Sequence, residues 1–339
     1  MTSHLSSVSF DALLLVSFGG PERPEDVTPF LNNVLRGKRV PPARIAEVAK
    51  HYAMFGGASP INEQNRAILA ALVAELNARG PHWPVYWGNR NWHPLLADTV
   101  RQMADDGVRH ALAFVTSAFG SYSGCRQYLE DIDNARREVG PRAPQVDKLR
   151  LFFNHLGFIE PMIQRAASAL ESVSEARRGA ARLVFTAHSI PQAMARTCRY
   201  EEQLREACRL VADGLHRPEW DLVYQSRSGP PQQPWLEPDV KQHLRCLRED
   251  AGVSDVVVVP IGFLCEHMEV IYDLDVETAG LCGELGINMV RSAPVGTHPR
   301  FVQMIRELIQ ERVDPHAPRL ALGTLGASPD SCPADCCRP

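Results

Sequence analysis

Four acidic residues recur at helical spacing within the stretch from 256 to 277, which reads VVVVPIGFLCEHMEVIYDLDVE. They are Glu266, Glu269, Asp273 and Glu277, and His267 lies beside them. At about 100° per residue, these acids share one face of a predicted helix that follows an apolar strand and a glycine. Because open α/β sheets bind ligands beyond the carboxyl ends of their strands, such a row could carry protons or cations. A solvated helix face explains the same spacing equally well.

A histidine directly follows another apolar stretch, in LVFTAHSIP. His188 stands where loop residues project into a cleft, and Pro191 prevents a helix from starting immediately. An imidazole in such a place can accept a proton near neutral pH or bind a metal ion. A lone histidine is more often structural, but the acidic row expected from the same sheet favours a functional role.

Other loops after predicted strands supply glycines, hydroxyls and aromatic rings. Gly19 and Gly20 allow a flat or charged ligand to approach closely, yet they lack the spacing of a dinucleotide fingerprint, so no nucleotide cofactor is expected. Ser59 precedes a proline at a helix start, which favours capping over ligand contact. Trp235, in a proline-rich loop, either packs or lines a planar-ligand pocket. With no GxSxG motif and no phosphate loop, the set favours proton and cation handling on a bound planar molecule.

The elements that must position these residues alternate between apolar strands and amphipathic helices. Strands are predicted at 12–18, 85–88, 111–116, 149–153, 183–187, 222–225, 256–261 and 288–291, and the helices include 62–78 and 300–312. Strands that are each followed by helix signals indicate an α/β protein with parallel sheets. Because four strands lie on each side of a small, charged loop at 171–182, we predict two similar lobes with a cleft between them.

Length and composition fit this organisation. A chain of 339 residues with 45% hydrophobic and 22% charged residues can bury two domain cores. The formal charge of -4 predicts no basic surface for nucleic acid. No apolar run approaches the roughly 20 residues of a transmembrane helix, and the segment 12–18 has no signal-peptide features. The cytoplasm, with no transmembrane segment, is therefore the expectation.

The cysteines divide into scattered thiols and a terminal group. Among nine cysteines, most stand singly, which indicates reduced thiols. Cys332, Cys336 and Cys337 instead lie in a tail, from 314 onward, that is rich in Pro, Gly, Ser and Ala and is predicted to have little regular structure. Three thiols without a core to pack in suggest metal or cluster ligation.

Five segments together resemble the ferrochelatase family, whose members insert ferrous iron into a porphyrin. They are LLLVSFGGP, FGGASPI, TAHSIP, YQSRSGPPQQPWLEPDV and GFLCEHMEVIYDLD, in the family's order, and the likeness covers roughly residues 11 to 312. The resemblance implies two Rossmann-like lobes at 8–150 and 151–313, each with a four-stranded parallel sheet flanked by helices, and an active-site cleft between them. Residues 314–339 would form a flexible, cysteine-containing tail.

The family's catalytic pair matches His188 and Glu269, which the resemblance places on opposite sides of the macrocycle and implicates in metal binding, with His267 beside them. Metallation removes two pyrrole protons and strips water from Fe2+, the metal substrate, and imidazole and carboxylate suit both tasks. Which member of the pair delivers iron and which accepts protons stays open. The residues expected to continue the carboxylates as a proton or metal relay are Glu266, Asp273 and Glu277.

The porphyrin itself is expected to be coproporphyrin III. The segment 35–61 is short and charged and lacks the apolar lip of membrane-docked relatives, so it resembles the branch that uses this four-propionate porphyrin. The expected porphyrin contacts are Phe18, Arg36, Arg39, Ser59, Tyr122, Ser123, Tyr128 and Trp235. His51 departs from the family pattern, since relatives often have an arginine there that contacts a propionate.

The expected function is therefore insertion of Fe2+ into coproporphyrin III to give coproheme III in haem biosynthesis. The alternatives are a protoporphyrin IX ferrochelatase, a cobalt or nickel chelatase for another tetrapyrrole, and a tetrapyrrole or haem carrier without catalysis. The enzyme is expected to be a monomer that makes transient contacts with other haem-pathway enzymes.

Some relatives hold a 2Fe-2S cluster through C-terminal cysteines and one internal cysteine, which implies Cys332, Cys336 and Cys337 as ligands here. The spacing is unusual, because adjacent cysteines strain a shared cluster. The internal ligand of the animal enzymes aligns near Pro161, so another cysteine would have to supply the fourth ligand.

Overall fold

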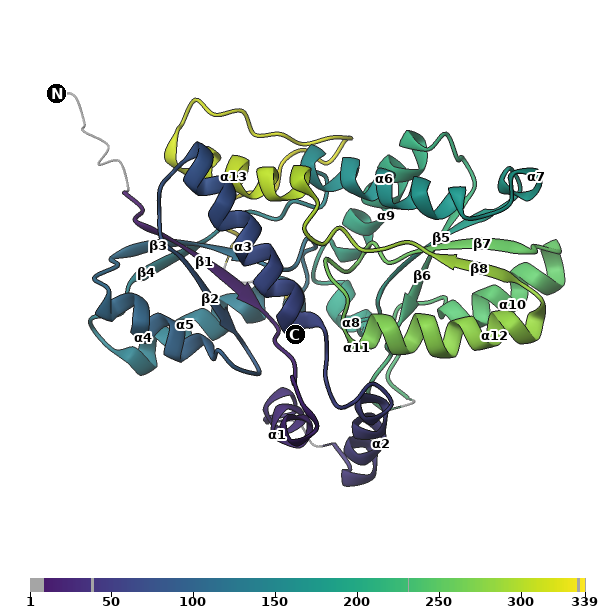
Figure 1. Ribbon diagram of the computed structural model, residues 1–339, viewed down its shortest axis with the longest axis horizontal. Coiled ribbons are helices and arrows are strands. Elements are labelled where there is room, and N and C mark those ends of the chain that lie inside the picture. The colour runs from purple at the N-terminus through teal and green to yellow at the C-terminus, as the bar shows by residue number, and fades with distance from the viewer. Residues whose placement is uncertain (1–8, 38–39, 231, 334–335, 339) are drawn as a thin grey trace.

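The computed structural model describes residues 9–37, 40–230, 232–333 and 336–338. These residues form two four-stranded sheets with the strand orders β2-β1-β3-β4 and β6-β5-β7-β8, and every strand pairing in them is parallel. The predicted fold class, two parallel α/β sheets flanked by helices, is confirmed (Figure 1).

The first sheet and its helices come from the N-terminal half of the chain. In chain order its elements are β1 (Ala12–Ser17), α1 (Pro24–Val34), α2 (Pro42–Ala53), α3 (Ile61–Arg79), β2 (Val85–Asn89), α4 (Leu96–Asp105), β3 (His110–Val115), η1 (Tyr122–Arg126), α5 (Gln127–Val139) and β4 (Gln145–Lys148). The second half contains α6 (Leu156–Glu171), α7 (Glu175–Arg178), β5 (Arg182–His188), α8 (Gln192–Ala195), α9 (Tyr200–Gly214), β6 (Trp220–Gln225), α10 (Val240–Ala251), β7 (Asp255–Val259), α11 (Met268–Val270), η2 (Ile271–Thr278), α12 (Ala279–Leu285), β8 (Asn288–Arg291) and α13 (Pro299–Val313).

The central strands are covered on both faces, which agrees with their unbroken apolar sequences. All six residues of β1, ALLLVS, are buried, and so are all five residues of β7, DVVVV. Leucine and β-branched side chains suit a strand that has helices on each side. Because β5 lies between β6 and β7, the chain segments that follow these three strands emerge side by side at one edge of the sheet.

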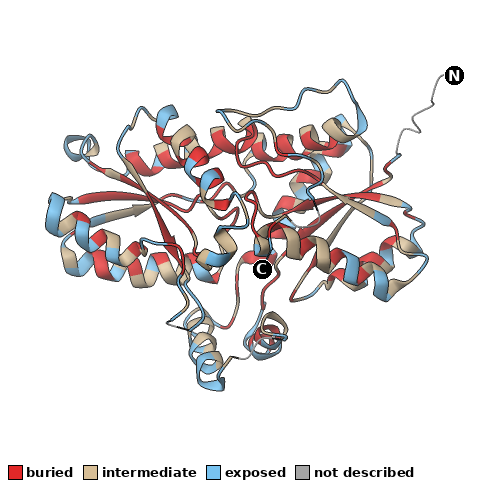
Figure 2. Ribbon diagram, turned by 180° about the vertical axis from the view of Figure 1, so that it is seen from behind, coloured by how far each residue is buried: buried red, intermediate tan, exposed pale blue. Residues whose placement is uncertain are grey.

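Helices cover both faces of each sheet, and burial follows these layers (Figure 2). On the first sheet, α4 and α5 enclose one apolar cluster that includes Leu14 and Val100. On the second sheet, α10 and α12 enclose a cluster that includes Leu244 and Val258. The other faces, covered by α3, α6, α9 and α13, share one larger cluster. Among the described helices, none has both the length and the apolar character needed to cross a membrane.

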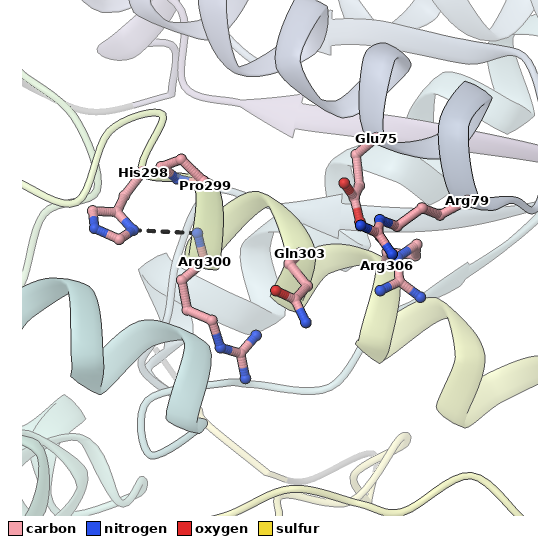
Figure 3. A pocket seen from close by; sticks show the side chains of 7 residues that line it. All are labelled: Glu75, Arg79, His298, Pro299, Arg300, Gln303 and Arg306. Atoms are coloured by element: carbon pink, nitrogen blue, oxygen red, sulfur yellow. Dashed lines mark hydrogen bonds and ion pairs between the residues drawn. The ribbon is translucent and has the colours of Figure 1, made fainter.

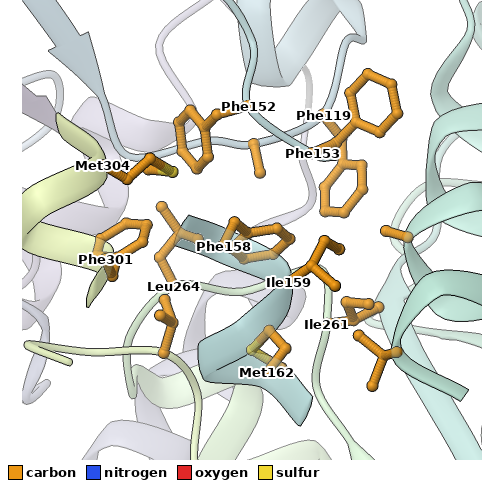
Figure 4. Packing of buried hydrophobic residues seen from close by; sticks show 14 of the residues in the cluster. Phe119, Phe152, Phe153, Phe158, Ile159, Met162, Ile261, Leu264, Phe301 and Met304 are labelled. Atoms are coloured by element: carbon orange, nitrogen blue, oxygen red, sulfur yellow. The ribbon is translucent and has the colours of Figure 1, made fainter. Parts of the chain in front are cut away.

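This larger cluster joins the two halves of the chain. Figure 4 shows Phe152 and Phe153 near Phe158 of α6 and Phe301 of α13. The ring of Phe152 lies 5.9 Å from that of Phe158 and 5.9 Å from that of Phe301, in edge-on arrangements. The C-terminal helix α13 packs against both α3 and α6, so it ties the first sheet's helices to those of the second.

One predicted strand is wrong. The fourth strand of the first sheet is β4, which pairs with β3, and not the apolar run at 149–153. That run leaves the sheet and enters the shared core, where Phe152 and Phe153 are each 2% exposed. An apolar run of this length suits a buried strand and a buried loop equally, so its hydrophobic pattern does not separate the two.

The helix after β7 starts later than predicted. Residues 262–267 form turns and extended backbone, and helical structure begins at Met268. It then widens into the π-helical segment η2 before α12. Glu266 and His267 therefore precede the helix. The acids that the helix does carry in the predicted row are Glu269, Asp273 and Glu277.

The tail has no helix or strand among its described residues, as its composition predicts. Hydrogen bonds nevertheless hold it on the protein. Arg150 Nη2 donates to Leu320 O at 2.8 Å, and Asn154 Nδ2 donates to Gly326 O at 2.9 Å. Two buried side chains thus contact its backbone, and the flexibility of the tail stays a prediction.

Candidate active site

His188 and Glu269 lie at, or just beyond, the carboxyl ends of two neighbouring strands of the second sheet. His188 is the last residue of β5, and Glu269 lies in α11, just after the loop that leaves β7. Gly262 lets that loop pass close to β5, because a Cβ there would lie 2.7 Å from the Cα of Ala187. The amide of Gly262 also donates to Thr186 O at 3.1 Å. The two loops are thereby fixed against one another at the carboxyl edge of the sheet.

The imidazole and the carboxylate of this pair face each other. His188 Nε2 lies 3.7 Å from Glu269 Oε2, and the two side chains are 33% and 54% exposed. The other ring nitrogen, Nδ1, lies 2.5 Å from the backbone oxygen of Ser189. Because that oxygen can only accept, it holds a proton on Nδ1 and leaves Nε2 to exchange a proton with the carboxylate or with a ligand.

Electrostatics stabilise the pair in its ionised form. Burial by itself would lower the pKa of His188, but the adjacent Glu269 carboxylate raises that pKa above its ordinary value. Burial would raise the pKa of Glu269, but His188 and His267 lower it to about 2. The pKa of His267 is itself lowered, chiefly by its partial burial and also by the nearby His188. One imidazole with a raised pKa and one with a lowered pKa therefore flank the same carboxylate.

The pair does not enclose a flat ring. Contact on both faces of a planar macrocycle requires about 7 Å between the flanking groups, at roughly 3.5 Å per face, whereas the two atoms are 3.7 Å apart. The expectation that His188 and Glu269 lie on opposite sides of the macrocycle is therefore wrong. Both groups come from the same edge of one sheet, so they face a ligand from the same side.

Two further carboxylates follow Glu269 along the helix behind the pair. Next to Glu269 comes Asp273, which accepts a hydrogen bond from the hydroxyl of Ser226, just after β6. Glu277 is 38% exposed and lies 2.7 Å from Lys241 Nζ. Burial, together with the carboxylates of Glu269 and Glu277, raises the pKa of Asp273 to about 6. This carboxyl group therefore exchanges protons near neutral pH.

Glu266 lies away from this row. Its carboxylate pairs with Arg291 at 2.9 Å, and the same guanidinium binds Asp275 at 2.5 Å. Its backbone amide donates to Gln64 Oε1 at 3.1 Å. The row in the structure therefore does not include Glu266, whose part in a relay stays a prediction.

The first sheet supplies aromatic residues around a buried arginine. Phe18 follows β1, and its ring centroid lies 5.7 Å from the guanidinium carbon of Arg90. The same guanidinium stacks over Tyr128 at 4.5 Å and pairs with Asp131 at 2.5 Å. Tyr128 is 5% exposed, whereas Phe18 is only partly buried. Of the two predicted porphyrin contacts, Phe18 is thus the one with a ring accessible to a ligand.

Tyr122 and Ser123 lie in η1, beyond the carboxyl end of β3. The phenol of Tyr122 donates to Glu130 Oε2 at 3.0 Å, and Ser123 Oγ donates to Met194 Sδ at 3.9 Å. Such π-helical turns are frequent at functional sites, and the contact of these hydroxyls with the porphyrin stays a prediction.

Ser59 and Trp235 are both buried against neighbouring loops. Ser59 is 7% exposed, and its Oγ lies 3.5 Å from the amide of Ile61, the first residue of α3, as a long capping contact. Trp235 is 7% exposed and bridges through its backbone to Pro191, in the loop after His188. Each residue therefore shapes a loop beside the site.

The two arginines predicted to bind propionates follow α1. Arg36 is exposed, and its Nη2 donates to Asn33 Oδ1 at 2.7 Å. Arg39 lies outside the described residues.

Helix α2 covers the acidic row from the side of the first half. The ring of His51 stacks on Tyr272 of η2, with centroids 3.7 Å apart and an interplanar angle of 12°. Burial and the Glu269 carboxylate both raise the pKa of Tyr52, so this phenol lies within electrostatic range of the catalytic pair. The residue that replaces the family's arginine thus packs on the helix that carries the acids.

Three residues beside the site were not assigned from the sequence. Ser226, with φ of 60° in the left-handed region, binds Asp273, while Tyr52 and Arg90 act on Glu269 and Phe18 as described. Ser226 lies in a recognisable loop after a strand, but no spacing in the sequence connects it to the acidic row. No sequence pattern pointed to Tyr52 or Arg90.

A separate cavity of about 480 Å3 lies between α3 and α13 (Figure 3). It is lined by arginines that include Arg79, Arg300 and Arg306, and Arg306 pairs with Glu75 at 2.7 Å. The catalytic pair does not line it, so this cavity is distinct from the site above.

The fold resembles that of solved chelatases. The structure of SirB from Bacillus subtilis with Fe3+ matches 93% of this chain and 100% of its own, with a TM-score of 0.57 and 13% sequence identity. The sirohydrochlorin chelatase SirB from B. subtilis subspecies spizizenii, in complex with cobalt, matches the same share of this chain with a TM-score of 0.53. At this identity the likeness shows the fold alone, and it places the chain in the chelatase fold class.

Sequence comparison identifies the family. The ferrochelatase family model matches residues 10–313. Ferrochelatase of Rhodopirellula baltica is 56% identical over 328 residues, which cover 97% of this chain and 93% of that protein. Coproporphyrin III ferrochelatase of Frankia alni is 51% identical over 351 residues, which cover 100% of this chain and 89% of that protein. The chain therefore belongs to the ferrochelatase family, as its motifs indicated, and it is an enzyme that inserts metal into a porphyrin.

Proposed function

We propose that this enzyme inserts Fe2+ into coproporphyrin III and releases coproheme III. The observation that carries the reaction is the ion pair of His188 and Glu269, 3.7 Å apart and continuous with further carboxylates. The porphyrin assignment is supported by relatives: coproporphyrin III ferrochelatases of Frankia alni and Nocardia farcinica are each 51% identical to this chain over nearly its whole length.

The segment before α3 also supports a porphyrin with four propionates. Helix α2 has no buried residue, and it exposes Arg44, Glu47 and Lys50. Among the large apolar side chains described on this segment, Met54 is the exposed one, at 60%. A charged rim suits carboxylate substituents better than the apolar substituents of protoporphyrin IX.

The arrangement divides metallation among the site's groups. The macrocycle lies between Phe18 and the face presented by His188 and Glu269. His188, with Nδ1 held by Ser189, passes a proton to the carboxylates and then accepts a pyrrole proton at Nε2. Asp273, whose pKa is about 6, takes each proton onward along the row. The same carboxylates favour the entry of Fe2+, because they supply negative charge where the protons leave.

A direct comparison of substrates tests the assignment. Purified protein is given Fe2+ and either coproporphyrin III or protoporphyrin IX without oxygen, and metallation is followed by porphyrin absorption. Faster turnover of coproporphyrin III is expected. Faster turnover of protoporphyrin IX would defeat the substrate proposal and leave the reaction class intact.

Substitutions test the site. His188→Ala and Glu269→Ala should each nearly abolish metallation, while porphyrin binding, measured by fluorescence quenching, stays detectable. His316→Ala and Glu284→Ala, which change exposed residues of the same types elsewhere, serve as controls and should metallate normally. Near-normal turnover by both site variants would refute the roles proposed for them.

We also propose that the enzyme works in the cytoplasm and as a monomer, which follows from the sequence expectations above. Light scattering during size-exclusion chromatography measures the mass directly. A mass near 37.6 kDa is expected, and a stable dimer would contradict the second statement.

We propose, in addition, that Cys332, Cys336 and Cys337 ligate a 2Fe-2S cluster. Thiolates are the usual ligands of such clusters, and Cys336 Sγ and Cys337 Sγ lie 3.5 Å apart. Among the described residues, no three donors are arranged around one metal ion, so the proposal rests on the resemblance and on this one pair. A bound cluster supplies a one-electron redox centre and a covalent link between its ligands. An ultraviolet-visible spectrum of protein purified without oxygen tests this, and the absence of both cluster absorption and bound iron would remove the proposal.

A further inference from the structure

Helices α1 and α2 form a unit of their own beside the site. Their apolar contacts make a small cluster around Val27, Phe30 and Leu31, which shares no residue with the other three described clusters. Figure 1 shows the two helices side by side, projecting away from both sheets. Helix α2 packs on α1, yet none of its own residues is buried. The position of α2 therefore depends on a few side-chain contacts.

A ring stack joins this unit to the second half of the chain. His51, in the last turn of α2, stacks on Tyr272 of η2, with centroids 3.7 Å apart and an interplanar angle of 12°. Parallel rings at this separation are in van der Waals contact. Both residues are partly buried, and the carboxylate of Glu277 acts electrostatically on the imidazole. Through this histidine, α2 contacts the helix that carries the acidic row.

The loop after β6 holds η2 from another direction. Gln225 Nε2 donates to Glu269 O at 3.1 Å and to Asp273 Oδ2 at 3.4 Å, and the Ser226 hydroxyl donates to the same oxygen of Asp273. Tyr272 lies between these two acids in the sequence, directly before Asp273. Segments of π-helix are rare and occur mostly as single turns. This one is held by side chains of the β6 loop and by the ring stack with α2.

Aromatic contacts continue from α2 to the opposite wall of the site. Tyr52 follows His51 in the chain, and its ring lies 6.0 Å from that of Phe30 in α1. The ring of Phe30 lies 6.3 Å from that of Phe18, again edge-on. A line of contacts therefore runs from η2, through α2 and α1, to the aromatic ring that follows β1.

We infer that His51 is a positioning residue, which sets the two walls of the porphyrin site against one another by stacking α2 on η2. The inference rests on the proposed function, in which the macrocycle lies between Phe18 and the face of His188 and Glu269. In this role His51 acts through Tyr272 and does not itself need to touch the porphyrin.

The expected effect is on porphyrin affinity. An aromatic pair changes an equilibrium constant by about 2- to 12-fold. Without the stack, a smaller fraction of the free protein has both walls in place, and the apparent dissociation constant for porphyrin rises by up to the same factor. Once bound, the porphyrin contacts both walls itself. The Michaelis constant KM should therefore rise while kcat changes little.

The test compares full-length wild type with His51→Ala, Tyr272→Ala, the double variant and His51→Phe, using coproporphyrin III and Fe2+ without oxygen. Each single alanine variant should raise KM for the porphyrin by about 2- to 12-fold. The double variant should be no worse than either single variant, because both substitutions remove the same contact. His51→Phe keeps a flat ring and should restore the wild-type KM. His316→Ala, at an exposed histidine elsewhere, is the control and should match wild type.

A direct contact between His51 and a propionate would give the opposite pattern. His51→Phe would then have a raised KM, and Tyr272→Ala would keep the wild-type value; either result would overturn the inference. Additive effects in the double variant would overturn it as well. Circular dichroism verifies folding. Should Tyr272→Ala misfold, His51→Phe decides, because it separates a stacking ring from a group that binds a carboxylate.

Porphyrin binding without iron separates this inference from the proposed function. Fluorescence quenching by each variant gives a Kd for coproporphyrin III that does not depend on turnover, and the Kd values should follow the same order as the KM values. Wild type that binds this porphyrin without metallating it would defeat the proposed function, while the Kd values would still confirm or overturn the role of His51. Wild type that does not bind it would overturn both.

Discussion

Replacing Asp273 by asparagine should stabilise the protein at alkaline pH. The pKa of this carboxyl group is raised from 3.8 to about 6, chiefly by burial and by the neighbouring carboxylates of Glu269 and Glu277. Because the pKa of this carboxyl group is higher in the folded protein, the group stabilises the native state most below pH 3.8, where it is protonated in both the folded and the unfolded state. This stabilisation is lost as the pH rises through 6. At pH 8 the folded protein therefore carries the cost of a buried, ionised Asp273.

The size of the effect follows from the pKa. Since each pKa unit corresponds to 1.36 kcal/mol, raising the pKa from 3.8 to about 6 costs about 3 kcal/mol at pH 8. Asparagine has no charge, and its amide oxygen can accept the same hydrogen bond from Ser226. At pH 5 the wild-type carboxyl is mostly protonated when folded and ionised when unfolded, which recovers about 1.4 kcal/mol. The advantage of the variant should therefore fall to about half.

Urea unfolding of both proteins at pH 8 and pH 5, without porphyrin, measures this difference. Asp275→Asn is the matched control, because Asp275 lies on the same helix but is 37% exposed and paired with Arg291 at 2.5 Å; this variant should not be stabilised. The Asp273→Asn variant should also metallate more slowly, since its side chain cannot carry a proton along the row. Equal stability of Asp273→Asn and wild type at pH 8, or a gain that does not shrink at pH 5, would refute the reasoning.

Three further predictions concern the pair and the scaffold. Glu269→Gln should lower the pKa of His188, because it removes the charge that raises this pKa and leaves the burial that lowers it; the imidazole resonances in an NMR titration should move to a lower midpoint. Gly262→Ala should lower the free energy of unfolding by about 1–3 kcal/mol, because its Cβ would meet the backbone at the end of β5 at 2.7 Å. Arg150→Leu should cost about 3–5 kcal/mol in urea unfolding, because it leaves Glu311, 2% exposed, without its partner.

Each of these has a control in the same chain. Glu266→Gln removes a carboxylate bound to Arg291 and should leave the titration midpoint of His188 unchanged. A midpoint that moves equally in Glu266→Gln and Glu269→Gln would contradict the first prediction. Gly280→Ala, at a helical glycine with open space around it, should be stabilising where Gly262→Ala is not. Arg101→Leu breaks the ion pair with Asp98, whose two side chains are 40% and 56% exposed, and should change the free energy of unfolding by less than about 1 kcal/mol. A loss as small as this in Arg150→Leu would contradict the third prediction.

Most of the scaffold could be predicted from local pattern. Apolar runs such as those of β1 and β7 predict buried parallel strands, because a strand covered on both faces has no polar side. The place of His188 at the end of β5 follows from its position after such a run. The run at 149–153 shows the limit of this reasoning: it is as apolar as a central strand, yet it fills the core between the sheets.

The spacing of acids predicted only part of the site. Glu269, Asp273 and Glu277 do follow one another, because residues four apart stay close on a helical turn. Glu266 has the same type and similar spacing, but the helix starts after it, and Arg291 binds it. Nothing local to the sequence distinguishes these two cases, since the helix start depends on how the loop after β7 packs.

Sequence by itself determined most of the segments that become strands and helices and which polar residues stand at the strands' carboxyl ends, because these depend on side-chain period along a few neighbouring positions. Tertiary structure alone decided that His188 and Glu269 share one side of the site and that Ser226 binds Asp273. Those distances are set by the packing of strands and loops that are far apart in the chain, and no local spacing records them.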